Sequence, residues 1–171
     1  MQIVKIPSAR IEAIVGKGGK TKKLIERLGH VNLVVDDEGN VQITSKDPLA
    51  EWKTVDVVKA IGRGFSIESA RKLFSDDCTL KIINLKEVFS KKKQRERYKA
   101  RVIGTKGKAK RTLAEISGAE ICIYGDTISA LGTIEEVELA IEGIRMLLRG
   151  APHSTTYFVL QKKKGELHQV R

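Results

Sequence analysis

Hydrophobic and polar positions follow the same order of elements twice along the chain. Alternating or β-branched runs predict strands, and apolar residues spaced three to four apart predict amphipathic helices. The first copy has a strand at 2–6, a helix after Ser8, a helix ending near Gly29, strands at 32–35 and 41–44, and a helix from Pro48. The second copy has a strand at 79–85, a helix over about 90–103, a helix ending near Gly118, strands at 120–124 and 127–131, and a helix after Thr133. Each copy therefore has the order β-α-α-β-β-α.

The starts of the two closing helices carry capping signals. In the first copy, Asp47 can accept a hydrogen bond as the N-cap residue, and Pro48 suits the first helical position. In the second copy, Thr133 and Glu136 have the spacing of a capping box. These signals fix where each closing helix begins.

The repeat divides the chain into four parts. We expect a first domain at 1–64, a connecting helix and loop at 65–78, a second domain at 79–160 and a basic tail at 161–171. The β-branched and aromatic run at 155–160 predicts a final strand in the second domain.

A glycine motif lies at the same place in both copies, between the two short helices. The run Ile14-Val-Gly-Lys-Gly-Gly-Lys-Thr-Lys-Lys23 returns as Val102-Ile-Gly-Thr-Lys-Gly-Lys-Ala-Lys-Arg111. A Gly-x-x-Gly turn carries no Cβ where another chain must approach closely, and it permits backbone angles that other residues resist. The start of the following helix attracts anions through its N–H groups and its dipole. The motif therefore predicts two sites for phosphate groups.

The positive charge of the chain is concentrated in one segment. The net charge is +11, and residues 86–111 hold 12 basic and 2 acidic residues. Such a segment attracts a polyanion such as a nucleic acid, although a solvated charged helix face would have the same composition. Because this segment forms the helix that leads into the second glycine motif, its charge is delivered to that motif.

The sequence contains no motif typical of a membrane protein, a secreted protein, a metalloprotein or a P-loop nucleotide-binding protein. No apolar run is long enough to cross a membrane, and no secretory signal is visible, so we expect a cytoplasmic protein. The spacing of Cys78, Cys122 and the three histidines predicts no metal site. A nucleotide-binding P-loop needs glycine where Ile14 stands. We therefore expect no enzyme activity and no cofactor.

The glycine motif within a β-α-α-β-β-α unit resembles the KH domain. The resemblance covers nearly the whole chain and implies an α+β fold of two tandem type I KH domains, each with a three-stranded sheet and its helices on one face. KH domains bind single-stranded nucleic acid at the glycine loop. The runs 104–114 and 149–154 further resemble the small-subunit ribosome-assembly KH proteins, in their archaeal form. That resemblance implies binding of small-subunit rRNA near its 3′ end, together with assembly proteins such as a Nob-type endonuclease.

The resemblance also implies roles for individual residues. Those expected to grip the RNA backbone are Gly16, Lys17, Gly18, Gly19, Lys20, Gly104, Thr105, Lys106, Gly107, Lys108, Lys110 and Arg111. Candidates for the walls of the base groove are Val15, Ile103, Leu33, Val35, Ile121 and Ile123, of which those in the hairpins also suit the core. Residues expected to attract RNA by charge alone are Lys91, Lys92, Lys93, Arg95 and Arg97.

Two alternatives stay open at this level. The chain could be a protein-binding scaffold, or a general RNA-binding regulator, in which one or both KH grooves are idle. If the grooves do bind RNA, we expect the second loop to contribute more, because the basic segment leads into it.

Overall fold

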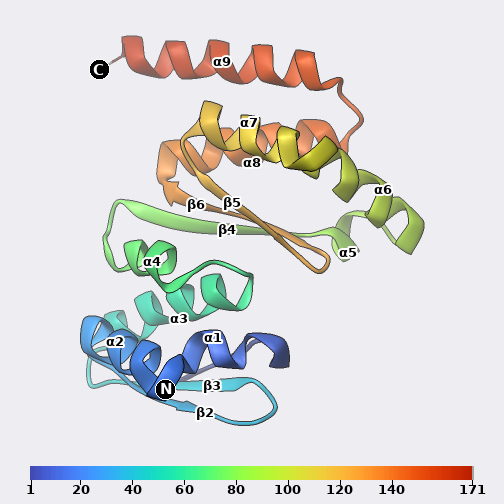
Figure 1. The fold of residues 1–171 in the computed structure, drawn as a ribbon. Coiled ribbons are helices and arrows are strands. Elements are labelled where there is room, and N and C mark those ends of the chain that lie inside the picture. The colour runs from blue at the N-terminus through green and yellow to red at the C-terminus, as the bar shows by residue number, and fades with distance from the viewer. Residues whose placement is uncertain (171) are drawn as a thin grey trace. The chain divides into compact units, whose positions relative to one another are not determined.

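The structure is a computed structural model that describes residues 1–170 and divides into two compact units, Met1–Leu80 and Lys81 onward. Each unit contains a three-stranded antiparallel sheet with helices packed on one face (Figure 1). The predicted α+β class and the repeated β-α-α-β-β-α order are confirmed.

The first unit builds its core between one face of its sheet and three helices. The elements are β1 (Gln2–Lys5), α1 (Ile11–Val15), α2 (Lys20–Gly29), β2 (Asn32–Val35), β3 (Asn40–Thr44), α3 (Pro48–Gly62) and α4 (Ile67–Ala70). The strand order is β1-β3-β2. Leu33 pairs with Ile43, and both are buried, whereas the neighbouring Val34 is exposed. The period of two along each strand therefore separates a covered face from an open one.

The segment after α3 packs onto the first unit. Leu73 is buried, and Phe74 lies so close to Gly29 that a Cβ on this glycine would be 3.0 Å from the ring. The same Cβ would be 2.5 Å from Thr54 Oγ1. Gly29 is thus required for packing, and the left-handed residue that ends α2 is His30, with φ of 54°.

The second unit has the same plan with one additional helix. Its elements are β4 (Cys78–Asn84), which crosses the division at Lys81, α5 (Leu85–Val88), α6 (Lys92–Ile103), α7 (Lys108–Ser117), β5 (Glu120–Tyr124), β6 (Thr127–Thr133), α8 (Ile134–Leu148) and α9 (His153–Gln169). The strand order is β4-β6-β5. Val102, Leu113, Ile128 and Ile144 are fully buried between the sheet and the helices.

Both predicted helix caps form. The Asp47 carboxylate accepts a hydrogen bond from the Leu49 N–H at 3.0 Å. Thr133 N–H donates to Glu136 Oε1 at 2.8 Å, and Glu136 N–H donates to Thr133 Oγ1 at 3.3 Å, which completes the capping box.

The predictions of a strand at 155–160 and of a separate tail from 161 are wrong. These residues belong to α9, up to Gln169, and α9 lies over α7 and α8 on the side away from the sheet (Figure 1). Leu160 fills the space over Gly143, where a Cβ would lie 2.5 Å from Leu160 Cδ1. Thr156 and Leu160, one turn apart, are fully buried, so packing overrides the β-propensity of the sequence. Arg171 lies outside the described residues.

The docking of α9 can be tested at Leu160. Leu160→Ala removes buried methyl groups from a close-packed site, so we expect the free energy of unfolding to fall by about 2–5 kcal/mol. Phe158→Ala is the matched control, because this side chain is 68% exposed on the same helix, and we expect a change within about 0.5 kcal/mol. Denaturant unfolding of the full chain measures both. Equal losses from the two variants would contradict the docking.

Candidate nucleic-acid interface

The two glycine loops have the same backbone conformation. In the first loop, Gly16, Gly18 and Gly19 have φ angles of 73°, 62° and 75°. At the equivalent positions of the second loop, Gly104, Lys106 and Gly107 have φ angles of 73°, 53° and 75°. In each loop, the last glycine donates its N–H to the carbonyl of the first, at 3.1 Å and 3.2 Å respectively. The shared Gly-x-x-Gly pattern thus corresponds to a shared backbone conformation.

The first glycine of each loop is needed for close packing as well as for its φ angle. A Cβ on Gly16 would lie 2.3 Å from Thr21 Oγ1, and a Cβ on Gly104 would lie 2.6 Å from the Cβ of Ala109. The end of one helix is therefore pressed against the start of the next. The last glycines, Gly19 and Gly107, face open space or a flexible guanidinium, so that only their φ angle favours glycine.

The third position of the loop distinguishes the two copies. Gly18 adopts a left-handed conformation without cost, whereas Lys106 adopts it as a residue with a side chain. The Arg111 guanidinium donates a hydrogen bond to the Lys106 carbonyl at 2.8 Å. Arg111 therefore has a structural role in the second loop, beside the RNA contact predicted for it.

Both loops present their basic side chains to solvent. Lys17, Lys20, Lys106 and Lys108 are exposed, and so are Gly18 and Thr105 in the middle of the loops. The first N–H groups of α2 and α7 have no partner within their own helix, and they carry the positive end of its dipole. Each loop thus combines accessible backbone, fixed partial charge and mobile full charges.

The predicted groove walls fall into two groups. Leu33 and Ile121, equivalent in the repeat, are only 1% and 7% exposed, which makes them core residues. Val35 and Ile123, two positions further along the same strands, are partly exposed in both copies. Val15 and Ile103, which precede the loops, are also partly exposed. The accessible apolar candidates are therefore one helix residue and one strand residue in each unit.

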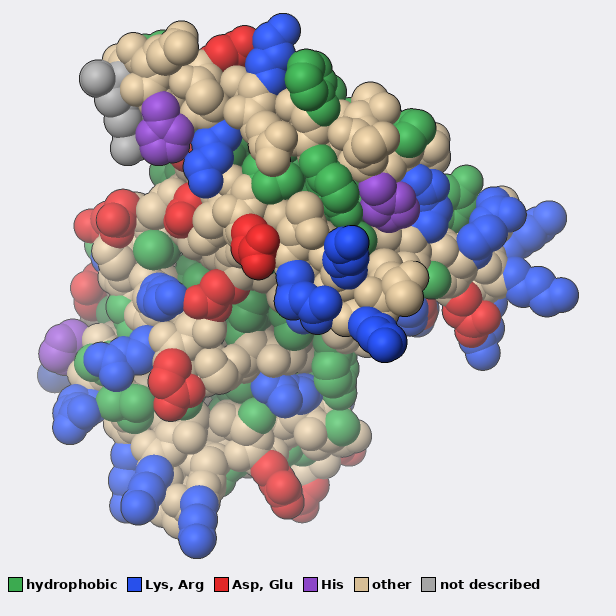
Figure 2. Space-filling model, turned by 45° about the horizontal axis from the view of Figure 1, so that its top comes forward, with side chains coloured by type: hydrophobic (Ala, Val, Ile, Leu, Met, Phe, Trp, Pro, Cys, Tyr) green, Lys and Arg blue, Asp and Glu red, His purple; other side chains and the backbone are tan. Residues whose placement is uncertain are grey.

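The basic segment forms α6, which starts at Lys92, two residues later than predicted. Lys91, Lys92, Lys93 and Arg97 are exposed. Figure 2 shows Lys and Arg side chains projecting on the right, where Figure 1 places α6. These four side chains can attract a polyanion.

Arg95 differs from its basic neighbours. Its guanidinium donates hydrogen bonds to the carbonyls of Phe89 and Ser90, each at 3.0 Å, and it lies 3.8 Å from the Asp126 carboxylate. Its side chain is largely covered. Arg95 therefore ties the start of α6 to the rest of the unit and is poorly placed for the electrostatic role predicted for it.

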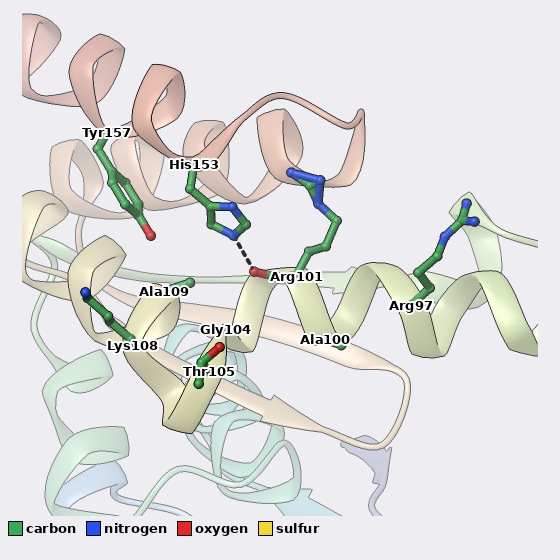
Figure 3. A pocket seen from close by; sticks show the side chains of 9 residues that line it. All are labelled: Arg97, Ala100, Arg101, Gly104, Thr105, Lys108, Ala109, His153 and Tyr157. Carbon is green, nitrogen blue, oxygen red and sulfur yellow. Dashed lines mark hydrogen bonds between the residues drawn. The ribbon is translucent and has the colours of Figure 1, made fainter.

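The segment that precedes α9 is fastened to the end of α6. The Arg101 guanidinium donates to the Ala151 carbonyl at 2.6 Å, and His153 Nε2 lies 2.9 Å from the Arg101 carbonyl (Figure 3). This carbonyl lies in the last turn of α6, where helix carbonyls lack intrahelical partners. His153 thus caps the helix that leads into the second glycine loop. The sequence singled out residues 149–154 only through their resemblance, because nothing local shows what His153 contacts.

The described residues 1–170 contain no cluster of metal-ligating side chains, no membrane-spanning helix and no disulfide. Within this part of the chain, no three His, Cys, Asp or Glu side chains are grouped so that they could hold a metal ion. No helix within it is sufficiently long and apolar to cross a membrane. Cys78 and Cys122 form no disulfide.

The strain at Lys106 gives a testable expectation. Because left-handed backbone costs a residue with a side chain about 1–2 kcal/mol, Lys106→Gly should be more stable than Lys106→Ala by about 1 kcal/mol. Lys106→Ala is the matched control, since both variants lose the same charge. Gly18→Lys should destabilise the first loop by a similar amount. Thermal unfolding measures these differences, and equal stability of the two Lys106 variants would show that the turn is not strained.

Comparisons with known proteins agree with this geometry. Residues 79–165 match a family model for the second KH domain of PNO1, described as a eukaryotic type KH-domain (KH-domain type I). The whole chain is 41% identical to the KH domain-containing protein MJ0443 of Methanocaldococcus jannaschii and covers 77% of it. These matches confirm the resemblance to KH proteins.

Two solved structures from Pyrococcus horikoshii share the fold. Dim2p is 40% identical, with a TM-score of 0.85 over 94% of this chain and 98% of that chain. A complex described as a/eIF2alpha, aDim2p and rRNA gives 40% identity and a TM-score of 0.88, over 96% of this chain and 94% of that chain. The chain therefore belongs to the Dim2p/PNO1-like family of KH-domain proteins, which are RNA-binding and non-catalytic.

Proposed function

We propose that this protein binds single-stranded small-subunit rRNA near its 3′ end during ribosome assembly, and that its two Gly-x-x-Gly loops grip the sugar-phosphate backbone. The observation that carries the proposal is the shared conformation of two exposed, lysine-flanked glycine loops, each at the start of a helix. The relative from Pyrococcus horikoshii was solved in a complex with rRNA, which supports this choice of RNA.

Each loop offers two kinds of phosphate contact. The backbone of Lys17 and Gly18, and that of Thr105 and Lys106, can approach a phosphate closely because the flanking glycines carry no side chain. Lys20 and Lys108, at the first position of the following helix, add a full positive charge. These contacts are independent of base identity, so the loops position the strand rather than read its sequence.

The bases would lie against the partly exposed apolar residues beside each loop. In the second unit these are Ile103 and Ile123, and in the first unit Val15 and Val35. Because KH domains clamp about four nucleotides, a short apolar wall of this kind is sufficient.

The second unit is proposed to contribute more affinity than the first. Helix α6 places the exposed Lys92, Lys93 and Arg97 on the path to the second loop, whereas α1 has only five residues and carries Glu12. Lys110 and Arg111 extend the positive field along α7. Because the two loops have the same conformation but more positive charge surrounds the second, we expect the second loop to bind RNA more tightly.

Protein partners are the second part of the proposal. The complex of the Pyrococcus relative contains a/eIF2alpha as well as rRNA. We expect this protein likewise to bind a protein partner together with its RNA, and the resemblance of residues 104–114 and 149–154 to ribosome-assembly KH proteins adds a Nob-type endonuclease as an expected partner. Co-purification of the protein with such an endonuclease, with and without the RNA, tests this part separately.

Loop variants of equal charge change test the main proposal. Thr105→Asp with Lys106→Asp should weaken binding to unstructured RNA about 10- to 100-fold, because hydrogen bonds to charged groups contribute about 1.5–3 kcal/mol. Lys17→Asp with Gly18→Asp should have a smaller effect. Fluorescence anisotropy measures the affinity, and circular dichroism shows that each variant is folded.

Gln161→Asp with Lys162→Asp is the matched control, because both residues are exposed on α9 and the charge changes by the same amount. We expect this control to bind nearly as well as the parent protein. Equal losses from the loop variants and the control would mean that net charge alone determines binding, and the loops would then have no special role.

The salt dependence of binding provides an independent measure of phosphate contacts. For single-stranded nucleic acid, the slope of log affinity against log salt is about −0.7 per neutralised phosphate. The second-loop variant should therefore have a shallower slope than the parent protein, by about 0.7 for each phosphate that it no longer neutralises. An unchanged slope would contradict a phosphate grip at this loop.

A further inference from the structure

A groove of about 510 Å³ lies beside the second glycine loop, at a place where the predicted base groove does not reach. The end of α6, the start of α7 and the start of α9 line it (Figure 3). No residue of the β5–β6 hairpin lines it, so it is distinct from the wall formed by Ile123. Helix α9, which completes this groove, lies outside the β-α-α-β-β-α unit.

The groove is continuous with the proposed phosphate grip. Gly104, Thr105 and Lys108 belong to the second loop and also line the groove. An RNA strand held at this loop would therefore meet the groove with its next nucleotide, without turning away from the protein surface.

Among residues 1–170, those that line the groove include three cationic side chains and no acidic one. Arg97 and Arg101 are one turn apart on α6, and Lys108 stands at the start of α7. Arg101 is held by its bond to Ala151, and its Nε atom is shielded from solvent without a hydrogen-bond partner in the described part of the chain. Arg97 and Lys108 are exposed, and the Arg97 guanidinium carbon lies 4.9 Å from the centroid of the Tyr98 ring. Both charges are accessible to a phosphate at this surface. Three positive charges at one place favour an anionic ligand.

Aromatic side chains form the opposite wall. His153 and Tyr157 point from α9 toward α6 and α7, and their ring centroids are 6.2 Å apart at 60° (Figure 3). Burial raises the pKa of the Tyr157 phenol, which keeps it neutral, and its hydroxyl is hydrogen bonded to Thr112. Ala100 and Ala109 leave space between the two walls. A sugar or a base fits beside such rings.

We propose that this groove binds one further nucleotide of the RNA strand, next to the nucleotides held by the second loop. Its phosphate pairs with Arg97 and Lys108, and its sugar and base pack against Tyr157 and the two alanines. The proposal rests on the proposed function and extends the RNA footprint of the second unit onto α9. His153 is a positioning residue, because its bond to the Arg101 carbonyl fixes the relation of α9 to the loop.

Two variants test the groove with little risk to the fold. Arg97→Gln removes an exposed charge, and Ala100→Glu introduces a repulsive carboxylate at an exposed helix position where no larger side chain is removed. Arg145→Gln is the matched control for Arg97→Gln, because Arg145 is exposed on α8 and does not line the groove.

The readout is affinity for RNA of two lengths. A strand of about four nucleotides fills a KH site, and one of about eight nucleotides also reaches the groove. Arg97→Gln and Ala100→Glu should weaken binding of the longer RNA about 3- to 10-fold and of the shorter one less than about twofold, because the first variant removes an exposed positive charge beside the phosphate and the second adds a negative one. Arg145→Gln should leave both affinities unchanged. The ring resonances of Tyr157 should shift with the longer RNA only.

Each other outcome has a distinct meaning. Equal losses at both lengths would show that the groove residues act only through the loop or through general charge, which overturns the proposal. Absence of any loss would overturn it as well. Binding of a free nucleoside monophosphate as tightly as the longer RNA would make the groove a mononucleotide site and not part of the strand path. If the variant with Asp at 105 and 106 binds RNA of both lengths normally, the proposed function fails, whatever happens at the groove.

Discussion

A steric contact at the first glycine of each loop determines how the functional surface is built. Gly16 lies against Thr21, and Gly104 lies against Ala109, at distances that admit no side chain on the glycine. This contact brings the end of one helix to the start of the next within a single short turn. The exposed backbone, the dipole of the second helix and the lysines therefore meet at one point of each unit. The surrounding sheet and helices keep these groups in their positions relative to one another.

Features with local signals could be predicted from the sequence. A capping box is defined by two residues three positions apart, here Thr133 and Glu136, so it could be found without knowledge of the tertiary structure. The hairpins and the glycine loops could be predicted for the same reason, because each is formed by residues that are consecutive in the sequence. Helix α9 could not be predicted in this way, because Thr155-Thr-Tyr-Phe-Val159 favours a strand by composition. What decides its conformation is the space over Gly143, which Leu160 fills.

The sequence also could not show which role each residue of the basic runs has. Arg95 and Arg97 are two residues apart and chemically equal, but only Arg95 reaches the carbonyls of Phe89 and Ser90. Arg111 likewise supports Lys106, although its spacing suggests a solvent-facing helix residue. Every residue has a backbone carbonyl, so the sequence does not show which carbonyl accepts a hydrogen bond from an arginine. Arginines with a structural role and arginines that face RNA therefore cannot be distinguished from the sequence.

The cap that His153 places on the Arg101 carbonyl spans 52 residues of sequence. During synthesis, the second glycine loop leaves the ribosome well before the residue that secures the helix in front of it. A nascent chain that ends before α9 has both glycines and all the loop lysines, but it lacks this cap. The hydrogen bond from His153 to the helix in front of the second loop can form only after α9 has emerged from the ribosome. The completed structure around this loop therefore depends on the translation of a distant segment.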